Sequence, residues 1–312
     1  MTSPQGRRPV VLGVDPDPTR RMALAWAVDE AARRRLPLWL VHAQGVPTGG
    51  YRSREVRPSW EEWNQALHAA GDQVLRAAVA FAESRRPEVE VSALLAEGHP
   101  AWVLRERARD ATAVVLGSWN LSTRQELFTS ASVALPVIAH APCPVIVVPE
   151  PEHTTQRPLY MVVGVDGSAH SAAAVDFAFG EAALRGATLR AIYVWDPPLT
   201  GVLDEHAALR ECRRVLSETV AGRTATHPEV ELHHEVVRGH PVEVLTEASA
   251  HAVGLVVGTR GRGGFTGMLL GSVSQGVLHH ARCPVLAVPD PYVRARDGGW
   301  SDTGGGGGGY VE

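Results

Sequence analysis

The sequence contains no lysine, and all 30 of its basic residues are arginine. This absence excludes the lysine of Walker-type phosphate loops, the ATP-binding lysine of kinases and every Schiff-base mechanism. Only three cysteines, Cys143, Cys212 and Cys283, occur in 312 residues. They are too few and too scattered for a disulfide framework, so we expect a reducing compartment.

Long apolar runs and a strong net charge are also absent. No run approaches the roughly 18 apolar residues of a membrane-spanning helix, and residues 1–8 lack the apolar core of a signal peptide. The formal net charge of −4 gives no electrostatic case for nucleic acid. We therefore expect a soluble cytoplasmic protein that binds neither a membrane nor a nucleic acid.

The chain repeats itself, with the same order of elements in two halves. Residues 88–118 align without gaps to residues 229–259, and 12 of these 31 positions are identical. Near the front of each half, Val-Leu-Gly-Val-Asp ends at Asp15 and Val-Val-Gly-Val-Asp ends at Asp166. A duplicated pattern of this length indicates two copies of one domain.

An apolar helical stripe follows the aspartate in both halves. It comprises Leu24, Ala27, Val28 and Ala31 in the first half and Val175, Ala178, Phe179 and Ala182 in the second. In the second half we expect strands near residues 161–165, 189–195, 231–237, 254–258 and 285–288. Continuous apolar strands that alternate with helices predict an α/β fold. We expect two tandem doubly wound domains, each a five-stranded, mostly parallel sheet with helices on both faces.

Each half closes with Cys-Pro and a short apolar strand, which marks a domain end. We place the first domain at residues 1–149 and the second at residues 158–290, joined by a polar, proline-containing linker at 150–157. Residues 291–312 include six consecutive glycines. This composition cannot bury a core, so we expect a disordered tail.

The strongest local motif lies between the fourth strand of the second half and the helix after it. Gly258 and Gly261 are followed, after nine further residues, by Gly271 and Ser272. Glycines let the backbone approach an anion closely, and we expect Ser272 to cap a helix whose free N–H groups point outward. The motif favours phosphate binding, and a glycine-rich loop without a ligand is the alternative.

Asp166, Gly167 and Ser168 follow the first strand of the second half and form the other wall of the same crevice. Ligands of open parallel sheets bind at the carboxyl ends of the strands. The Asp166 carboxylate is suited to a ribose hydroxyl or a magnesium ion. Ser168 is suited to capping the next helix, and both roles are compatible.

These motifs resemble the universal stress protein family, in particular its tandem-domain members, over about residues 10–289. The family's ATP-binding members carry G-x2-G-x9-G-[ST], which is matched by Gly258, Gly261, Gly271 and Ser272 together with Asp166. The resemblance implies that these glycines contact phosphates and ribose. It also implies that main-chain atoms near Val194, at the end of the second strand, face the adenine. Finally, it implies that the two domains pair through their closing strands about an approximate two-fold axis.

The first half departs from this motif. Gly117 remains, but Asn120 and Ala131 replace two of the glycines and the loop is one residue longer. Side chains crowd positions that need glycine. Asp17, aligned with Ser168, adds a negative charge where a triphosphate would lie. We therefore expect weak or absent ATP binding in the first domain.

Several other residues have a plain structural interpretation beside a chemical one. Arg260 and Arg262 lie within the motif and could pair with phosphates, but exposed arginines also commonly face solvent. A His-x2-Cys pair ends at Cys143 and again at Cys283. Because each copy supplies only two ligands, we do not expect a metal site. The repeated Gly-His-Pro at 98–100 and 239–241 is typical of a helix start.

The sequence thus predicts an ATP-binding sensor or regulator of stress adaptation, with ATP, and a candidate magnesium ion, held mainly by the second domain. No dedicated catalytic base is evident, so weak ATP hydrolysis or phosphoryl transfer is the enzyme alternative. A nucleotide-independent interaction scaffold is the third alternative. An unidentified protein partner follows from a regulatory role, and a homodimer follows by analogy with the family.

Overall fold

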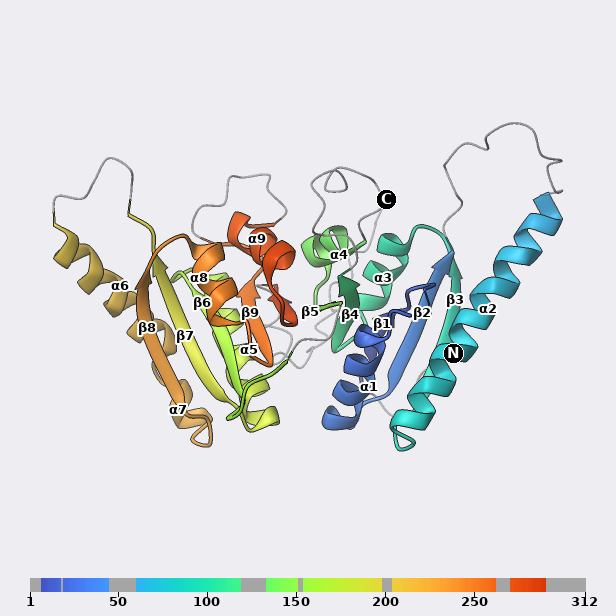
Figure 1. Cartoon of the computed structure of the whole chain (residues 1–312), viewed down its shortest axis with the longest axis horizontal. Helices are drawn as coiled ribbons and strands as arrows, with labels where there is room; N and C mark the ends of the chain where they lie inside the picture. The colour runs from blue at the N-terminus through green and yellow to red at the C-terminus, as the bar shows by residue number, and fades with distance from the viewer. Residues whose placement is uncertain are drawn as a thin grey trace, which may run out of the picture.

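The computed structural model describes residues 7–17, 19–44, 60–118, 133–150, 154–197, 204–261 and 270–289. The glycine-rich tail, Asn120, Ala131 and Arg262 lie outside the described residues, so the expectations stated for them stay predictions. The described elements alternate between strand and helix in both halves of the chain, apart from two consecutive helices in the second half (Figure 1).

The first half contains β1 (Val10–Gly13), α1 (Met22–Arg34), β2 (Leu38–Gln44), α2 (Trp60–Arg85), β3 (Val91–Glu97), α3 (Pro100–Ala108), β4 (Ala113–Ser118), α4 (Ala134–His140) and β5 (Val145–Pro149). The second half contains β6 (Tyr160–Val165), α5 (Ala169–Arg185), β7 (Thr188–Trp195), α6 (Glu205–Val220), α7 (Arg223–Thr226), β8 (Leu232–Arg238), α8 (Pro241–Ala248), β9 (Gly254–Gly258), α9 (Ser272–His280) and β10 (Val285–Val288). The five strands expected in the second half are all present, and the short helix α7 is an addition that the sequence pattern did not indicate.

The ten strands of the described residues form one sheet in the order β3-β2-β1-β4-β5-β10-β9-β6-β7-β8. Within each half every pairing is parallel, and the strand order is that of a doubly wound fold. The two halves join where β5 and β10 pair antiparallel, with Val147 opposite Val285 and Val145 opposite Ala287. Counted inward from the other edge of the sheet, β8, β7, β6, β9 and β10 take the places of their repeat counterparts β3, β2, β1, β4 and β5. An approximate two-fold axis therefore lies between β5 and β10, as the resemblance implies.

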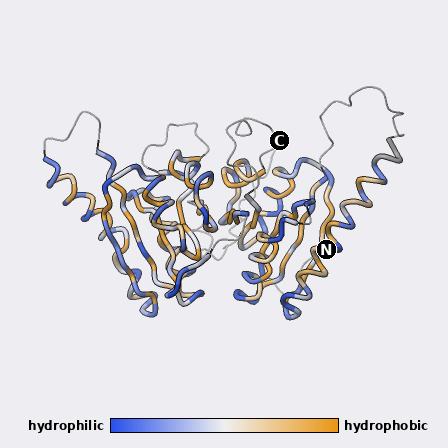
Figure 2. The backbone as a smooth tube through the Cα atoms, in the orientation of Figure 1, coloured by the Kyte–Doolittle hydropathy of each residue, from blue (hydrophilic) through white to orange (hydrophobic). Residues whose placement is uncertain are grey.

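Helices cover both faces of the sheet, as predicted. One core cluster gathers α1, α2, α5 and α6 on one face, and the other gathers α3, α4, α8 and α9 on the opposite face. Successive strand residues point to opposite faces, and accordingly Val10 and Leu12 enter the first cluster while Val11 enters the second. The strands are hydrophobic along the middle of the molecule (Figure 2). All eight residues of the predicted helical stripes are buried.

Charged side chains link the two domains beside the β5–β10 junction. Glu30 and Arg34 of α1 occupy the same places in the repeat as Glu181 and Arg185 of α5. Arg185 Nη2 lies 2.6 Å from Glu30 Oε2, and Arg34 pairs with Glu181. Each arginine also pairs with the glutamate one turn before it on its own helix. We call these four residues the interdomain ion cluster.

Candidate functional site

The turn after β6 is held by hydrogen bonds among its own residues. The Ser168 N–H donates to Asp166 Oδ1 at 2.9 Å, and Gly167 has φ 78°, a backbone conformation that favours glycine. Ser168 is the N-cap of α5, and its hydroxyl oxygen accepts from the Ser171 N–H at 3.2 Å. The capping role predicted for Ser168 is confirmed, and the turn fixes Asp166 at the carboxyl end of β6.

The segment after β9 is fixed from both sides. The Thr259 N–H donates to the Val288 carbonyl of β10 at 3.0 Å, and the Thr259 carbonyl accepts from the Gly271 N–H at 2.9 Å. The buried Ser274 hydroxyl of α9 donates to the Gly258 carbonyl at 2.6 Å. These bonds hold the end of β9 against the start of α9.

Two glycines of the motif leave no space for a side chain. A Cβ on Gly258 would lie 2.8 Å from the His170 carbonyl oxygen of α5, and a Cβ on Gly261 would lie 2.5 Å from Asp166 Oδ2. Gly271 differs, because its nearest neighbour would be the Arg260 Cα at 3.5 Å, an ordinary contact. Steric need therefore explains Gly258 and Gly261, and it does not explain Gly271.

The start of α9 corrects one expectation. Gly271, with φ −67° and ψ 148°, is the N-cap of α9, and Ser272 is the first helical residue. The prediction that Ser272 caps this helix is therefore wrong by one position. The physical reason is the hydrogen bond from the Gly271 N–H to Thr259, which holds Gly271 in the extended conformation of a cap. Among the described residues, no side chain caps the α9 N-terminus.

These elements enclose a cleft of about 380 Å³ at the carboxyl ends of β6, β7 and β9. Six of the eight predicted site residues line it, namely Asp166, Val194, Gly258, Gly261, Gly271 and Ser272. Gly167 and Ser168 do not line the cleft, and they shape the turn behind Asp166. The structure thus brings together residues that lie more than a hundred positions apart in the sequence.

Further lining residues were not predicted. These are Ser171, Ser274, Pro241, Leu245 and Leu270. Arg260, for which the sequence left a phosphate contact and a solvent-facing side chain open, lines the cleft as well. Ser171 and Ser274 follow Asp166 and Gly271 closely in the sequence, yet a serine near a helix start carries no signal that separates it from a cap. Pro241 was available as a signal, since it belongs to the repeated Gly-His-Pro that starts α8.

Comparison with known proteins shows which family the chain belongs to. The family model of the universal stress proteins matches residues 6–149 and again residues 160–289. The chain belongs to the universal stress protein family. It is 34% identical over 302 residues to Universal stress protein Rv2005c of Mycobacterium tuberculosis H37Rv, covering 92% of this chain and 98% of the relative. It is 32% identical over 295 residues to Universal stress protein Rv2623 of the same strain, with the same coverage of both chains.

A solved structure supports the fold over nearly the whole chain. The crystal structure of a universal stress protein from Archaeoglobus fulgidus DSM 4304 superposes with a TM-score of 0.68, covering 91% of this chain and 97% of that one. At 16% sequence identity, this likeness bears on the tandem architecture alone. The two universal stress protein domains therefore share one fold, and their sites must be compared residue by residue.

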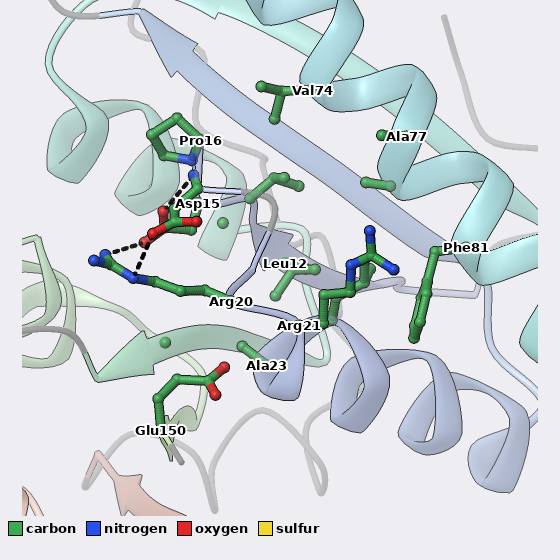
Figure 3. A pocket seen from close by; sticks show the side chains of 16 residues that line it. Leu12, Asp15, Pro16, Arg20, Arg21, Ala23, Val74, Ala77, Phe81 and Glu150 are labelled. Atoms are coloured by element: carbon green, nitrogen blue, oxygen red, sulfur yellow. Dashed lines mark hydrogen bonds and ion pairs between the residues drawn. The ribbon is translucent and has the colours of Figure 1, made fainter. Parts of the chain in front are cut away.

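The first universal stress protein domain keeps its aspartate, Asp15, and pairs it with an arginine. Arg20 Nη1 lies 3.3 Å from Asp15 Oδ2, and Arg20 Nε lies 3.2 Å from Asp17 Oδ2. Figure 3 shows Asp15 and Arg20 facing each other at the end of β1. Hydrogen bonds from the Thr19 hydroxyl and N–H hold the pKa of Asp17 below its ordinary value. Asp17 is thus ionised as expected, but Arg20 balances part of the charge that we expected to repel phosphate.

The pocket beside Asp15 is small and lies on the α1–α2 face of the sheet. Its lining combines apolar residues such as Phe81 with the charged side chains of Arg20, Arg21 and Glu150 (Figure 3). Its volume of about 70 Å³ is well below the roughly 300–1,000 Å³ of ligand pockets. Glu150, which follows β5, accepts a hydrogen bond from the Met22 N–H at 2.8 Å and so occupies the N-terminus of α1. A carboxylate of the protein therefore already occupies an anion position in this pocket.

On the opposite face, the first domain differs from the second at the positions that shape the cleft. Leu116 stands where the second domain has Val257, and a Cβ on Gly13 would lie 2.9 Å from a Leu116 methyl group. Ala134 aligns with Ser274 and has no hydroxyl to hold the end of β4. The helix α4 begins at Ala134, two aligned positions later than α9. The site of the first domain therefore differs from the cleft of the second domain in these residues as well as in the two motif glycines that the first half lacks.

The described residues contain no group of three or more His, Cys, Asp and Glu side chains placed to hold a metal ion. Burial raises the pKa of Cys143 to about 12 and that of Cys283 to about 11. Both thiols are therefore protonated at neutral pH. Nor does the described part of the chain contain a helix long and apolar enough to cross a membrane.

Proposed function

We propose that the second domain binds an ATP-type nucleotide and that the protein acts as a nucleotide-dependent sensor or regulator in stress adaptation. The observation that carries this proposal is the cleft at the carboxyl ends of β6, β7 and β9, where the motif glycines and Asp166 meet. Its volume of about 380 Å³ is within the range of small-molecule sites. A cytoplasmic location and a homodimer belong to the same proposal.

The start of α9 suits a polyphosphate. The N–H groups of Ser272, Val273 and Ser274 are in the first helical turn, where an α-helix offers them no intrahelical acceptor. All three residues line the cleft. The positive end of the helix dipole adds to their attraction for an anion. The Gly271 N–H is already bonded to Thr259, so we assign the phosphate contacts to the three amides after it.

The other end of the cleft suits a planar base. Ile192, Val194, Leu245 and Val257 give this part an apolar lining. β6 pairs with β7 only as far as Val165 and Tyr193, whereas β7 continues to Trp195 beside β8. Val194 therefore lies where β7 extends past β6, and its main chain can face a ligand. Recognition of the base by main-chain atoms is consistent with the role that the resemblance implies for Val194.

Asp166 is suited to the ribose or to a magnesium ion that accompanies the phosphates. It is the only carboxylate among the described residues that line the cleft. Nucleotide-bound Mg²⁺ takes most of its ligands from phosphate and water and one or two from the protein. The Asp166 carboxylate and the Ser272 hydroxyl are suited to be these one or two protein ligands. Bound magnesium would neutralise phosphate charge, and these two residues would position it.

We favour binding over catalysis. The described lining of the cleft contains no histidine and no second carboxylate that could activate a water molecule beside Asp166. Nucleotide binding alone does not accelerate cleavage without preferential stabilisation of the transition state. Bound ATP would instead favour one arrangement of the segment between β9 and α9 and thereby change which protein partner binds. Phosphate release by the wild type and by Asp166→Ala tests the enzyme alternative, which a large difference would support.

Gly271→Asp tests the proposed site. The backbone at Gly271 is compatible with any residue and a Cβ has space there, so the variant should fold. The new carboxylate would stand beside the first amides of α9 and repel phosphate. We expect ATP affinity to fall at least about tenfold, which corresponds to about 1.4 kcal/mol, in isothermal titration calorimetry.

Ala131→Asp is the matched control, because Ala131 is the position aligned with Gly271 in the first domain. It should leave ATP affinity and stoichiometry unchanged. Native mass spectrometry of the purified wild type distinguishes the scaffold alternative. A protein that carries no nucleotide and accepts none when ATP is added would contradict the proposal.

A further inference from the structure

Arg260 is the one cationic side chain among the described residues that line the cleft. It lies between Gly258 and Gly261 in the segment after β9, and its side chain is exposed. The only anionic side chain in the same lining is Asp166. The charges of the described side chains that line the cleft therefore nearly balance until an anion enters, and the exposed Arg260 side chain can reach such an anion.

The backbone at Arg260 is fixed. Thr259, the residue before it, bonds to β10 through its N–H and to Gly271 through its carbonyl. Gly261, the residue after it, packs against the Asp166 carboxylate without space for a side chain. The Arg260 Cα lies against Gly271, at 3.5 Å from where a Cβ would stand. Arg260 is thus held beside the start of α9, and only its side chain needs to move to meet a ligand.

The repeat provides a comparison within the same chain. The position aligned with Arg260 in the first domain is Trp119, whose side chain carries no charge. The cation is therefore present in the copy with the complete motif and missing from the copy that lacks two of its glycines. Because the chain has no lysine, arginine is the only side chain that stays cationic regardless of pH.

We propose that Arg260 makes the second domain select nucleotides by the length of their phosphate chain, so that a triphosphate binds much more tightly than a monophosphate. This inference rests on the proposed function. The amides of α9 can satisfy one phosphate group wherever it lies, whereas a guanidinium beside them gains from each additional charge. The base and ribose are bound by other residues, so they contribute equally to ATP and AMP.

Arg260→Gln tests this inference in the full chain. Affinities for ATP, ADP, AMP and adenosine are measured by titration calorimetry at two salt concentrations. We expect ATP affinity to fall about 10- to 100-fold, the range for loss of charge-assisted hydrogen bonds, while adenosine and AMP change less than about twofold. The ATP-to-AMP ratio and its salt dependence should fall together. Arg260→Lys, which keeps the charge, should restore most of the ratio.

Arg282→Gln is the matched control, because Arg282 is exposed after the end of α9 and does not line the cleft. It should leave every affinity unchanged. An unaltered ATP-to-AMP ratio in Arg260→Gln would overturn the inference, as would an equal loss for ATP and adenosine, which would indicate a structural role. A wild type that binds no adenine nucleotide would overturn the proposed function itself, and is thereby distinguished from failure of Arg260 alone.

Discussion

At the scale of single residues, two glycines of one motif serve different purposes. Gly261 is required by space, since a Cβ there would meet Asp166 Oδ2 at 2.5 Å, whereas the nearest contact at Gly271 would be 3.5 Å. A sequence motif treats both glycines alike. The structure separates Gly261, where a side chain has no space, from Gly271, where a side chain has space.

Gly261→Ala should therefore damage the site where Gly271→Ala is tolerated by the fold. The new methyl group must displace the Asp166 carboxylate, and overpacking of this kind costs typically about 1–3 kcal/mol. We expect a clearly lower midpoint of thermal unfolding for Gly261→Ala, and a smaller decrease for Gly271→Ala, which only replaces an N-cap glycine by the less suitable alanine. Calorimetry without ligand makes the comparison. Equal midpoints for the two variants would show that Asp166 moves aside freely.

At the scale of elements, the helices that follow the two matching aspartates begin differently. Ser168 caps α5 with its side chain, whereas α1 has Arg21 at its cap position and receives the Glu150 carboxylate from beyond β5. The second domain therefore starts its first helix with local residues. The first domain draws on a residue 128 positions away.

Removing the Ser168 hydroxyl should destabilise the second domain. Loss of an N-cap side chain costs about 0.5–2 kcal/mol, and Ser168→Ala should lower the free energy of urea unfolding by about 1 kcal/mol. Ser217→Ala serves as the control, because Ser217 is an exposed residue within α6. The control should be neutral or slightly stabilising, since alanine has the higher helix propensity. Equal effects of the two substitutions would argue against a capping contribution.

Elements were more predictable from the sequence than the contacts between them. Apolar runs predicted β9 and β10 at their observed bounds, because a buried parallel strand is apolar on both faces and ends at a glycine or proline. The cap of α9 was misplaced by one residue, because serine and glycine both suit that position and a hydrogen bond to Thr259 decides between them. The pairing of Arg20 with Asp15 and Asp17 was missed, since spacing alone does not show which way an arginine turns.

At the scale of the whole molecule, the ion pairs of the interdomain ion cluster could not be predicted from the sequence either. Its pairs cross between α1 and α5, and the repeat, which aligns Glu30 with Glu181, does not show that side chains of the two helices meet. Only 1% of the Glu30 side chain and 7% of the Arg185 side chain are exposed to solvent. Charges buried this deeply are tolerated because each has two partners or more, and removing one leaves the others uncompensated.

Because of the interdomain ion cluster, we expect the stability of the contact between the two domains to depend on pH in the acidic range. Burial would raise the pKa of Glu30, but the guanidinium groups of Arg185, Arg34 and Arg33 outweigh it and hold the pKa below its ordinary value of 4.5. A carboxylate whose pKa is lowered by folding contributes stability above the pKa of the unfolded chain. That contribution is lost as the pH falls through the lower pKa of the folded state. Acid should therefore weaken the α1–α5 junction below about pH 4.5.

Glu30→Gln tests this coupling. Breaking a buried ion pair from one side costs about 3–5 kcal/mol, so the variant should unfold at a clearly lower urea concentration than the wild type at pH 7. The difference should narrow as the pH falls below 4.5, because the unfolded wild type then takes up a proton at Glu30 that the folded protein does not bind until a lower pH. Glu235→Gln is the control, since its pair with Arg190 is exposed and should contribute less than about 1 kcal/mol at either pH. If the difference between Glu30→Gln and the wild type were the same at pH 7 and pH 3.5, the ionised carboxylate would not be what joins the two domains.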